Sequence, residues 1–237
     1  MSVLRPFRRI GLALDPGGRR LRAELRQLSR LIDPADRVLD LGSGKAPYKS
    51  MFVHRQYVTA DLFAKADVRC DATALPFADQ AFDLAICTEV LEHVPEPAVT
   101  LGELNRLLSD GGTLVLTTPL TWGVHETFDF HRWTDTGLQR LLTRGGFEVE
   151  TVRPRGGVLL CLGALLLIVP WQLFGAAAGR RWWRTLLFAL TYPMLLVPAT
   201  VLAVLDPLDR QQKFTQGYVA LCRKKQDLLP AGDGLTV

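Results

Sequence analysis

Two glycines separated by one residue follow an acidic side chain in the stretch VLDLGSGKAPY, residues 38–48. Glycine has no Cβ, so a backbone built on Gly42 and Gly44 can approach a bound ligand closely. The carboxylate of Asp40 beside them repels phosphate and favours a cationic or amine-bearing ligand. The stretch therefore predicts a ligand loop of this kind at the end of a strand.

Two common glycine loops do not fit this stretch. A Walker-type phosphate loop needs a glycine where Leu39 stands and a Ser or Thr where Ala46 stands. A dinucleotide loop needs a third glycine, and that position is Pro47. Asp61 ends the next strand and can accept hydrogen bonds from ribose hydroxyls. A ligand with an ammonium, a sulfonium and a ribose but no phosphate, S-adenosylmethionine, meets these requirements.

The segments around the loop alternate between apolar runs and helical patterns. Strands are expected within 37–44, 57–63, 67–77, 82–90, 113–119, 147–154 and 217–225, and helices within 96–112 and 134–147. Gly111–Gly112 and Gly145–Gly146 are expected to stop the two helices, and a Thr or Asp cap to open the second. Such alternation predicts an α/β fold with a parallel sheet, which binds ligands beyond the carboxyl ends of its strands.

Five motifs in this order resemble class I S-adenosylmethionine-dependent methyltransferases, of the branch often called methyltransferase type 11. They are VLDLGSGKAPY, ADLF, CDATALPFADQAFDLAICTEVLEHVPEP, GGTLVLTTP and HRWTDTGLQRLLTRGGFEVE. The resemblance covers about 35–154 and resumes at 214–224. It implies a Rossmann-like sheet of seven strands, mostly parallel with the last antiparallel, and S-adenosylmethionine as the cofactor.

The resemblance also implies roles for single residues. Asp71 would bind the adenine amino group, with backbone contact from Ala72, and Thr88 would lie next to the donor methyl. The full set expected to bind the cofactor is Asp40, Gly42, Ser43, Gly44, Tyr48, Asp61, Leu62, Asp71, Ala72 and Thr88. Ser43 stands where many relatives have Cys, and Lys45 is unusual there, but neither contradicts donor binding.

Methyl transfer from a sulfonium needs an aligned nucleophile and sometimes a base. The segment 121–134 follows the fifth strand and contains many titratable side chains among aromatic ones. This composition predicts the wall of a substrate pocket. His131, His125 and His93 are the candidate catalytic residues, and Glu126, Arg132 and Trp133 the candidate substrate-binding residues. The alternatives are a lid held by stacking and salt bridges, and a capping role for His93. HETFD is not a zinc motif, because Asp129 stands where a second His is required, and no metal is expected.

An apolar insertion separates the sixth strand from the seventh. Residues 156–179 and 185–205 carry no charge, and RRWWR lies between them at 180–184. We expect a hydrophobic helical hairpin, and each stretch is long enough to cross a bilayer. The preferred arrangement is a monotopic hairpin in the cytoplasmic leaflet. A two-span hairpin is the second, and a soluble helical cap that buries a dimer interface or a lipid tail is the third.

The sequence therefore divides into four parts. A basic amphipathic segment, 1–34, precedes a methyltransferase domain at 35–154 and 214–225, the insertion at 155–210, and a flexible tail at 226–237. The chain carries a net charge of +4, and the basic N-terminal segment suits an anionic membrane surface. Nucleic acid is not an expected partner, because no recognisable binding module accompanies the basic residues. The four cysteines stand singly, so we expect buried thiols in a reducing compartment.

The predicted function is methyl transfer, by default to oxygen, onto an amphiphilic or lipid-linked acceptor at the cytoplasmic face of the cell membrane. One alternative is a methyltransferase for a soluble small molecule or glycan, with the insertion as an anchor or homodimer surface. Another is a catalytically idle S-adenosylmethionine-binding membrane protein.

Overall fold

The computed structural model describes residues 16–124, 127–174 and 182–225. The chain forms two compact units that interleave along the sequence. Among the described residues, the sheet unit comprises 28–118, 124, 127–153 and 219–225, and the hairpin unit comprises 16–27, 119–123, 154–174 and 182–218.

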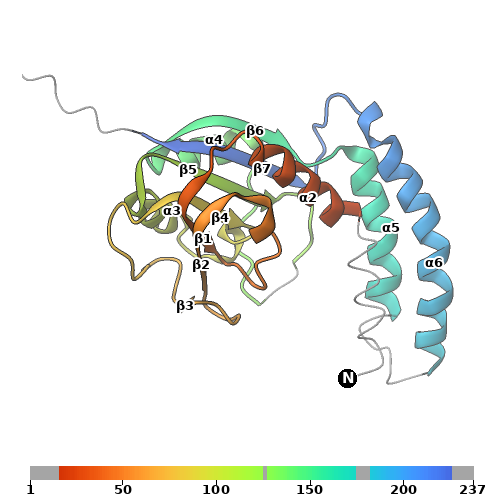
Figure 1. The fold of residues 1–237 in the computed structure, drawn as a ribbon. Coiled ribbons are helices and arrows are strands. Elements are labelled where there is room, and N and C mark those ends of the chain that lie inside the picture. The colour runs from red at the N-terminus through yellow and green to blue at the C-terminus, as the bar shows by residue number, and fades with distance from the viewer. Residues whose placement is uncertain (1–15, 125–126, 175–181, 226–237) are drawn as a thin grey trace, which may run out of the picture. The chain divides into compact units, whose positions relative to one another are not determined.

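A seven-stranded sheet runs through the structure (Figure 1). The strands are β1 (Ala35–Leu41), β2 (His54–Asp61), β3 (Val68–Arg69), β4 (Phe82–Thr88), β5 (Leu108–Pro119), β6 (Phe147–Pro154) and β7 (Gly217–Lys224). Their order is β3-β2-β1-β4-β5-β7-β6. The strands from β3 to β5 in this order pair in parallel, and the last strand is antiparallel. The predicted fold is confirmed.

The central strands are buried along most of their length, as expected for parallel strands covered on both faces. In β1, Val38 and Leu39 are fully buried, and in β4 Ile86 and Cys87 are fully buried. Apolar side chains on successive positions are therefore the reason why these segments form inner strands. Their carboxyl ends lie at one edge of the sheet, where the predicted loop begins.

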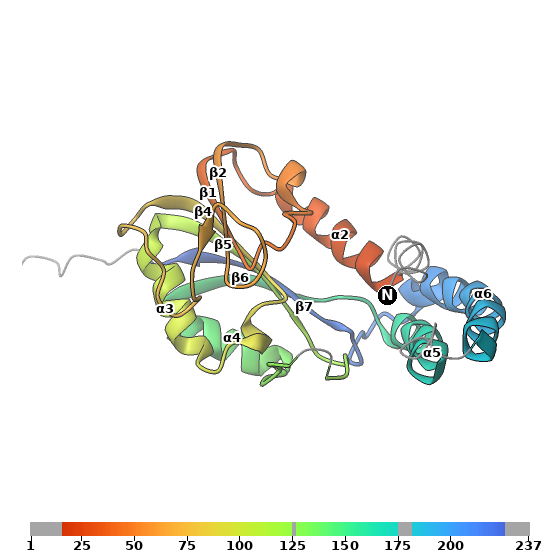
Figure 2. The same cartoon turned by 90° about the horizontal axis from the view of Figure 1, so that it is seen from below.

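Helices α3 (Pro97–Leu107) and α4 (Asp135–Arg144) lie side by side against the sheet (Figure 2). Thr134 caps α4, since its hydroxyl oxygen accepts a hydrogen bond from the Gly137 N–H at 3.3 Å. Gly146 lies in the turn that follows α4 and has a φ of +86°, a conformation that glycine adopts without strain. The predicted Thr cap and glycine stop of this helix are both present. Short 3-10 turns, η1 (Lys49–Met51) and η2 (Leu91–His93), follow β1 and β4.

Two boundaries differ from the sequence prediction. The first helix ends at Leu107 rather than at the glycine pair, and β5 begins at Leu108, whose ψ is 139°. Leu108 is opposite Phe82 in the β4–β5 ladder, so strand pairing takes this residue out of the helix. The expected third strand is reduced to Val68–Arg69, and the loop after it carries Asp71.

The hairpin unit contains α2 (Pro16–Ser29, whose last two residues fall in the sheet unit), α5 (Val158–Phe174) and α6 (Trp182–Leu205). The side chains of Leu21 and Leu25 in α2 are buried, as their helical spacing predicts. The prolines of the insertion do not break its helices, since Pro193 and Pro198 lie inside a continuous α6 and a third proline lies inside α5.

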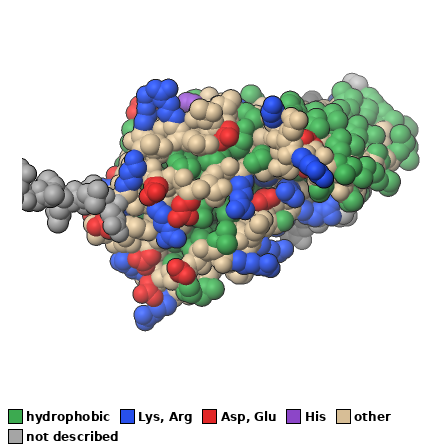
Figure 3. Space-filling model, turned by 90° about the horizontal axis from the view of Figure 1, so that it is seen from above, with side chains coloured by type: hydrophobic (Ala, Val, Ile, Leu, Met, Phe, Trp, Pro, Cys, Tyr) green, Lys and Arg blue, Asp and Glu red, His purple; other side chains and the backbone are tan. Residues whose placement is uncertain are grey.

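Helices α5 and α6 form an antiparallel pair with a tight seam (Figure 1). A Cβ on Gly163 would lie 2.9 Å from the carbonyl oxygen of Ala199, so glycine permits this close approach. Leu160, Ala164, Leu167 and Phe188 are also buried. Figure 3 shows hydrophobic side chains gathered over this hairpin, because its outer surface is apolar as well.

Two carboxylates close the base of the hairpin. Asp206, in the turn η4 (Asp206–Leu208), accepts hydrogen bonds from the N–H groups of Gly157 at 2.8 and 3.0 Å and of Leu160 at 2.8 Å. Asp209 accepts one from the Val158 N–H at 2.9 Å. The first N–H groups of a helix have no partner within it. These two side chains therefore cap α5 and join the two ends of the insertion.

We expect Gly102→Ala and Gly112→Ala to change stability in opposite directions. Gly102 is exposed within α3, and a Cβ there would meet nothing within 4 Å, so alanine should add about 0.5–1 kcal/mol to the free energy of unfolding. A Cβ on Gly112 would lie 2.7 Å from the carbonyl oxygen of Ser109, so alanine should remove about 1–3 kcal/mol. Urea unfolding followed by circular dichroism measures both. Equal shifts of the two midpoints would contradict the packing described for Gly112.

Candidate functional site

The loop after β1 is held in a shape that favours glycine. Gly42 and Gly44 have φ of +66° and +54°, in the left-handed region. A Cβ on Gly42 would lie 2.2 Å from Cγ2 of Val90, whereas one on Gly44 would meet nothing within 4 Å. The first glycine thus permits packing against the loop after β4, and the second leaves open space beside the backbone.

Asp40 is a buried carboxylate at the end of β1, with 1% of its surface exposed. The hydroxyl of Tyr57 donates a hydrogen bond to its Oδ2 at 2.7 Å. Burial raises the pKa of Asp40 to about 6, with a further rise from the nearby Asp61, and the Tyr57 hydrogen bond partly offsets this. Among the described residues, neither Asp40 Oδ1 nor the buried Ser43 Oγ has a hydrogen-bond partner. Buried polar atoms are normally paired, so these two fit a polar ligand.

Asp61 is the second carboxylate of the site. Its Oδ2 accepts a hydrogen bond from the Gly44 N–H at 3.0 Å, and its Oδ1 accepts from the N–H groups of Phe63 at 2.8 Å and Ala64 at 2.7 Å. Partial burial favours the neutral acid, but the three N–H groups outweigh it and hold the pKa of Asp61 below its usual range. Asp61 is therefore ionised and fixes the glycine loop.

Asp71 lies in the exposed loop after β3, where its Oδ1 accepts hydrogen bonds from the N–H and the hydroxyl of Thr73. Asp71 and Asp61 both lie near Cys70: burial first, and then these two carboxylates, raise the pKa of the Cys70 thiol. The carboxyl ends of β1, β2 and β3 thus bring Asp40, Asp61 and Asp71 to one region.

The other residues predicted for the cofactor lie around these loops. Thr88 is buried at the end of β4, Tyr48 is half-buried before η1, Ala72 is half-buried, and Leu62 is 38% exposed.

Sequence reasoning missed three residues that support the site. They are Tyr57, which donates to Asp40, Val90, which packs on Gly42, and Glu89. Glu89 has φ of +53°, and its N–H and Oε1 are both hydrogen-bonded to Thr117 on β5. A non-glycine residue held in this conformation is typical of functional sites. The signal available in the sequence was the position of Glu89 directly after a strand end.

The segment 121–134, predicted to line the substrate pocket and called here the candidate acceptor segment, contacts the loop after β4. The N–H groups of Phe130 and His131 donate to the carbonyl oxygen of Glu92, at 2.8 and 3.3 Å. The His93 ring and the carbonyl of Phe128 form a second connection, 2.5 Å long. Because Val90 of the same loop packs on Gly42, these contacts bring the donor loop and the histidines into one neighbourhood.

Hydrogen bonds to carbonyl oxygens indicate which ring nitrogens carry protons, since a carbonyl can only accept. His131 Nε2 lies 3.2 Å from the carbonyl oxygen of Pro95, so Nε2 is the donor and Nδ1 keeps the lone pair in the neutral ring. In His93, Nδ1 is the donor to Phe128, and Nε2 lies 3.7 Å from Oε1 of the buried Glu92. Each ring therefore presents one basic nitrogen.

Arg132 is engaged within its own segment. Its guanidinium forms a two-pronged ion pair with Asp129, which includes Nη2 to Oδ2 at 2.8 Å, and it donates to the His131 carbonyl at 2.7 Å. These hydrogen bonds raise the pKa of Arg132. The ring of Trp133 lies 5.3 Å from that of His131. His125 and Glu126, also predicted here, lie outside the described residues.

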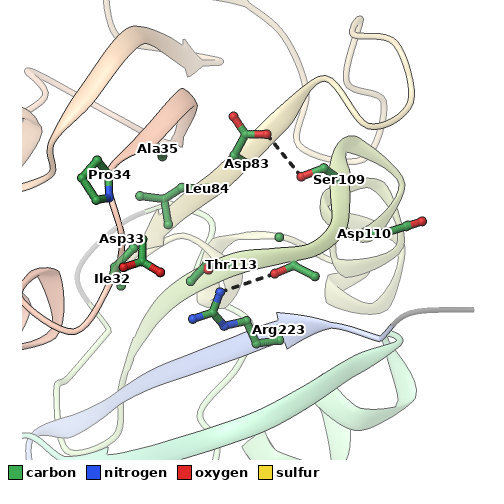
Figure 4. Close-up of a pocket in the computed structure, with 12 residues that line it drawn as sticks. Ile32, Asp33, Pro34, Ala35, Asp83, Leu84, Ser109, Asp110, Thr113 and Arg223 are labelled. Atoms are coloured by element: carbon green, nitrogen blue, oxygen red, sulfur yellow. Dashed lines mark hydrogen bonds between the residues drawn. The ribbon is translucent and has the colours of Figure 1, made fainter.

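A separate pocket lies at the opposite, amino-terminal edge of the strands (Figure 4). Its polar side chains tie neighbouring strands together. Asp83 accepts hydrogen bonds from Arg37 and from the hydroxyl of Ser109, and Arg223 donates to the Gly111 carbonyl. Ligands of such sheets bind at the other edge, so this pocket is not the candidate site.

Comparison with known proteins identifies the family. Residues 14–152, more than half of the chain, match the sequence profile described as "Methyltransferase domain". The chain belongs to this methyltransferase family. An uncharacterized methyltransferase of Mycobacterium sp. (strain KMS) is 32% identical over 123 residues, which cover 44% of this chain and 49% of the relative. The chain thus spans about half the length of the curated relatives it matches.

Solved structures share the fold of this methyltransferase. The [4+2]-cyclase SpnF has a TM-score of 0.56 and 17% identity, over 85% of this chain and 81% of that one. The 1,6-didemethyltoxoflavin-N1-methyltransferase of Burkholderia thailandensis, solved with bound S-adenosylhomocysteine, has a TM-score of 0.52 and 17% identity, over 90% and 79%. The predicted family and fold are confirmed, whereas the predicted roles of single site residues stay predictions.

The pKa of Asp40 predicts how donor affinity depends on pH. If ionised Asp40 attracts a cationic donor, affinity for S-adenosylmethionine should fall up to tenfold per pH unit below about 6, where the carboxylate takes up a proton. Tyr57→Phe removes a hydrogen bond that favours the ionised form, so it should move the midpoint to higher pH. Calorimetric titration of the donor at several pH values measures both.

The same pKa also predicts how the stability of the folded protein depends on pH. This second measurement needs no ligand and serves as a control. Because the pKa of Asp40 is raised on folding, its contribution to stability is fully present below the unfolded value of 3.8 and is lost as the pH rises through about 6. Asp40→Asn should flatten both pH profiles. A donor affinity that varies with pH equally in the native protein and in Asp40→Asn would contradict the assignment of Asp40.

Proposed function

We propose that this protein is an S-adenosylmethionine-dependent methyltransferase that modifies an amphiphilic or lipid-linked acceptor at the cytoplasmic face of the cell membrane. The observation that carries the proposal is one connected set of contacts. Gly42 packs on Val90, and Glu92, two residues later, accepts hydrogen bonds from Phe130 and His131. A donor loop and a segment with basic nitrogens therefore lie next to each other, as methyl transfer requires.

The donor residues fit the proposed cofactor. Asp40 Oδ1 and Ser43 Oγ are buried and have no partner among the described residues, and Gly44 has open space beside its Cα. Asp61 uses three of the about four acceptor positions of a carboxylate, so it keeps one for a ribose hydroxyl. Both hydrogen bonds to Asp71 end on Oδ1, which leaves Oδ2 for the adenine amino group. When bound, S-adenosylmethionine supplies an activated methyl group.

An oxygen nucleophile requires removal of its proton. The Nδ1 lone pair of His131 is suited to this step, because Nε2–H is fixed on the Pro95 carbonyl and holds the ring in place. His93 is the second candidate, and its basic nitrogen faces the carboxylate of Glu92. Arg132 is held by Asp129 in the same segment, and its planar guanidinium is the candidate group to recognise an anionic part of the acceptor.

Exposed aromatic side chains support an amphiphilic acceptor. Phe128 and Phe130 are 52% and 49% exposed, and their rings stack with centroids 6.2 Å apart. The ring of Phe130 also lies 6.1 Å from that of His131, so an apolar surface lies directly beside the proposed base. Together with the apolar hairpin, this surface favours a lipid-type acceptor over a fully polar one.

The first test follows labelled methyl groups. Purified protein is mixed with isotope-labelled S-adenosylmethionine and membranes of the cell that makes it, and organic-soluble and aqueous label are separated. We expect transfer into the organic phase. Asp61→Ala, which removes the carboxylate that fixes the glycine loop, should abolish transfer and donor binding together. Label confined to the aqueous phase would overturn the lipid-type acceptor, and donor binding without any transfer would favour an idle binding protein.

A second test concerns the base. His131→Gln keeps an N–H donor for the Pro95 carbonyl but has no basic nitrogen, so kcat should fall about 10²–10⁴-fold. Donor affinity should stay unchanged. His54→Gln is the matched control for kcat. His54, at the start of β2, forms its hydrogen bond with the Phe52 carbonyl and packs its ring on Tyr57 rather than on the segment that carries His131, so kcat should stay unaffected. An unchanged kcat in His131→Gln would exclude His131 as the base.

A further inference from the structure

We infer that α5 and α6 enter the bilayer end-on, as a preformed two-helix hairpin that crosses the hydrocarbon core, rather than lying in one leaflet. This inference deepens the proposed function, on which it rests for the presence of a membrane substrate. The inference rests on three properties of the hairpin. They are its length, the absence of a polar face along its described residues, and the hydrogen bonds that satisfy the backbone groups at both ends of α5.

The lengths match the bilayer. The 24 residues of α6 measure about 36 Å and the 17 residues of α5 about 25 Å, at about 1.5 Å per residue. The hydrocarbon core is about 30 Å thick, and helices of about 17–25 residues cross it. The charged residues of this part stand at the two ends, with Arg184 at the tip and Asp206 at the base.

The sides of the hairpin differ from those of helices that lie in a membrane surface. A helix in the interface needs a polar face for the headgroups. Within the segment Trp182–Leu208, only 11% of the most apolar stretch of 18 residues is buried, so α6 is not a core helix. Apart from Gln172 near the tip end of α5, the exposed large side chains along the pair are apolar and include Leu162, Leu165, Val169 and Leu173 on α5, and Leu186, Leu190, Met194, Val197, Val201 and Val204 on α6. The hydroxyl of Thr191 donates to the Leu187 carbonyl of its own helix at 2.6 Å.

Charged side chains of α6 and of the residues that follow it form hydrogen bonds with backbone groups at both ends of α5. Asp206 and Asp209 accept hydrogen bonds from its first N–H groups. At the other end, Arg184 donates to the carbonyl of Leu173 at 3.3 Å and lies 5.5 Å from the ring centre of Trp183. In lipid, backbone groups must be satisfied inside the protein. Trp and Arg at the tip suit the far headgroup layer, where aromatic side chains concentrate.

Cysteine labelling of the full chain in membrane vesicles tests the crossing. Cys70 is half-buried and the other three cysteines are buried, so Cys70→Ser provides the background. Single cysteines are placed at exposed positions of the tip, middle and base, as Trp182→Cys, Val197→Cys and Leu208→Cys. The probe is a membrane-impermeant maleimide, applied to vesicles of either orientation, and native Cys70 alone reports the side of the sheet unit.

We expect Leu208→Cys to react from the same side as Cys70, Trp182→Cys only from the opposite side, and Val197→Cys from neither. Reaction of Trp182→Cys from the side of Leu208→Cys would overturn the crossing in favour of a hairpin within one leaflet. Recovery of the protein as a soluble dimer, with Val197→Cys protected, would overturn it in favour of a second copy as the partner.

A charge in the middle of α6 provides a second measurement. Met194 is 72% exposed, so Met194→Arg would place a charge in the hydrocarbon and should lower the insertion equilibrium on the order of a hundredfold. Leu208→Arg, at the base, is the matched control and should remain in the membrane after an alkaline wash. Equal retention of both variants would contradict the crossing. Labelled methyl transfer on the same vesicles is independent of topology, so it separates failure of this inference from failure of the proposed function.

Discussion

The site depends on one contact, between the backbone of Gly42 and the side chain of Val90. Any larger residue would put a Cβ 2.2 Å from Cγ2 of Val90, and the left-handed φ of +66° excludes most of them in any case. This contact fixes the loop after β1 against the loop after β4. The second loop then carries Glu92, whose carbonyl holds the acceptor segment through Phe130. The candidate donor loop and the candidate acceptor segment are therefore positioned next to each other by the protein itself, before any ligand contributes energy.

Asp40 and Asp61 lie close together at the same edge of the sheet, but their pKa values are shifted in opposite directions. Asp61 is stabilised as an anion by three N–H groups, which lower its pKa, whereas burial raises the pKa of Asp40 to about 6. The charge of Asp61 also opposes ionisation of Asp40, so a cationic group beside them would relieve this repulsion. The site thus favours a positively charged ligand through electrostatics already present in the protein.

The fold and the donor loop could be predicted because their signals are local. Apolar runs, glycine pairs and an Asp after a strand all lie within a few residues of one another. The remainder depends on distant pairs: Tyr57 reaches Asp40 only through the register of β1 and β2, and Asp206 caps a helix that begins about fifty residues earlier. The end of α3 at Leu107 was missed for the same reason, because a ladder partner in β4 determines it. No sequence window contains such information.

The sheet alone does not determine the chemistry, since a [4+2]-cyclase shares this fold. This chain carries an insertion between β6 and β7 that leaves the sheet and returns to it between two neighbouring strands. The N–H of Arg155 donates to the carbonyl of Gly217 at 2.8 Å, and Asp206 joins Gly157 to the end of α6, so both ends of the insertion are fastened together. An even number of helices meets this constraint, because the chain must return to the side from which it left. The pairing of β7 beside β6 therefore does not depend on what surrounds the hairpin, and the sheet can keep its geometry in any environment of the insertion.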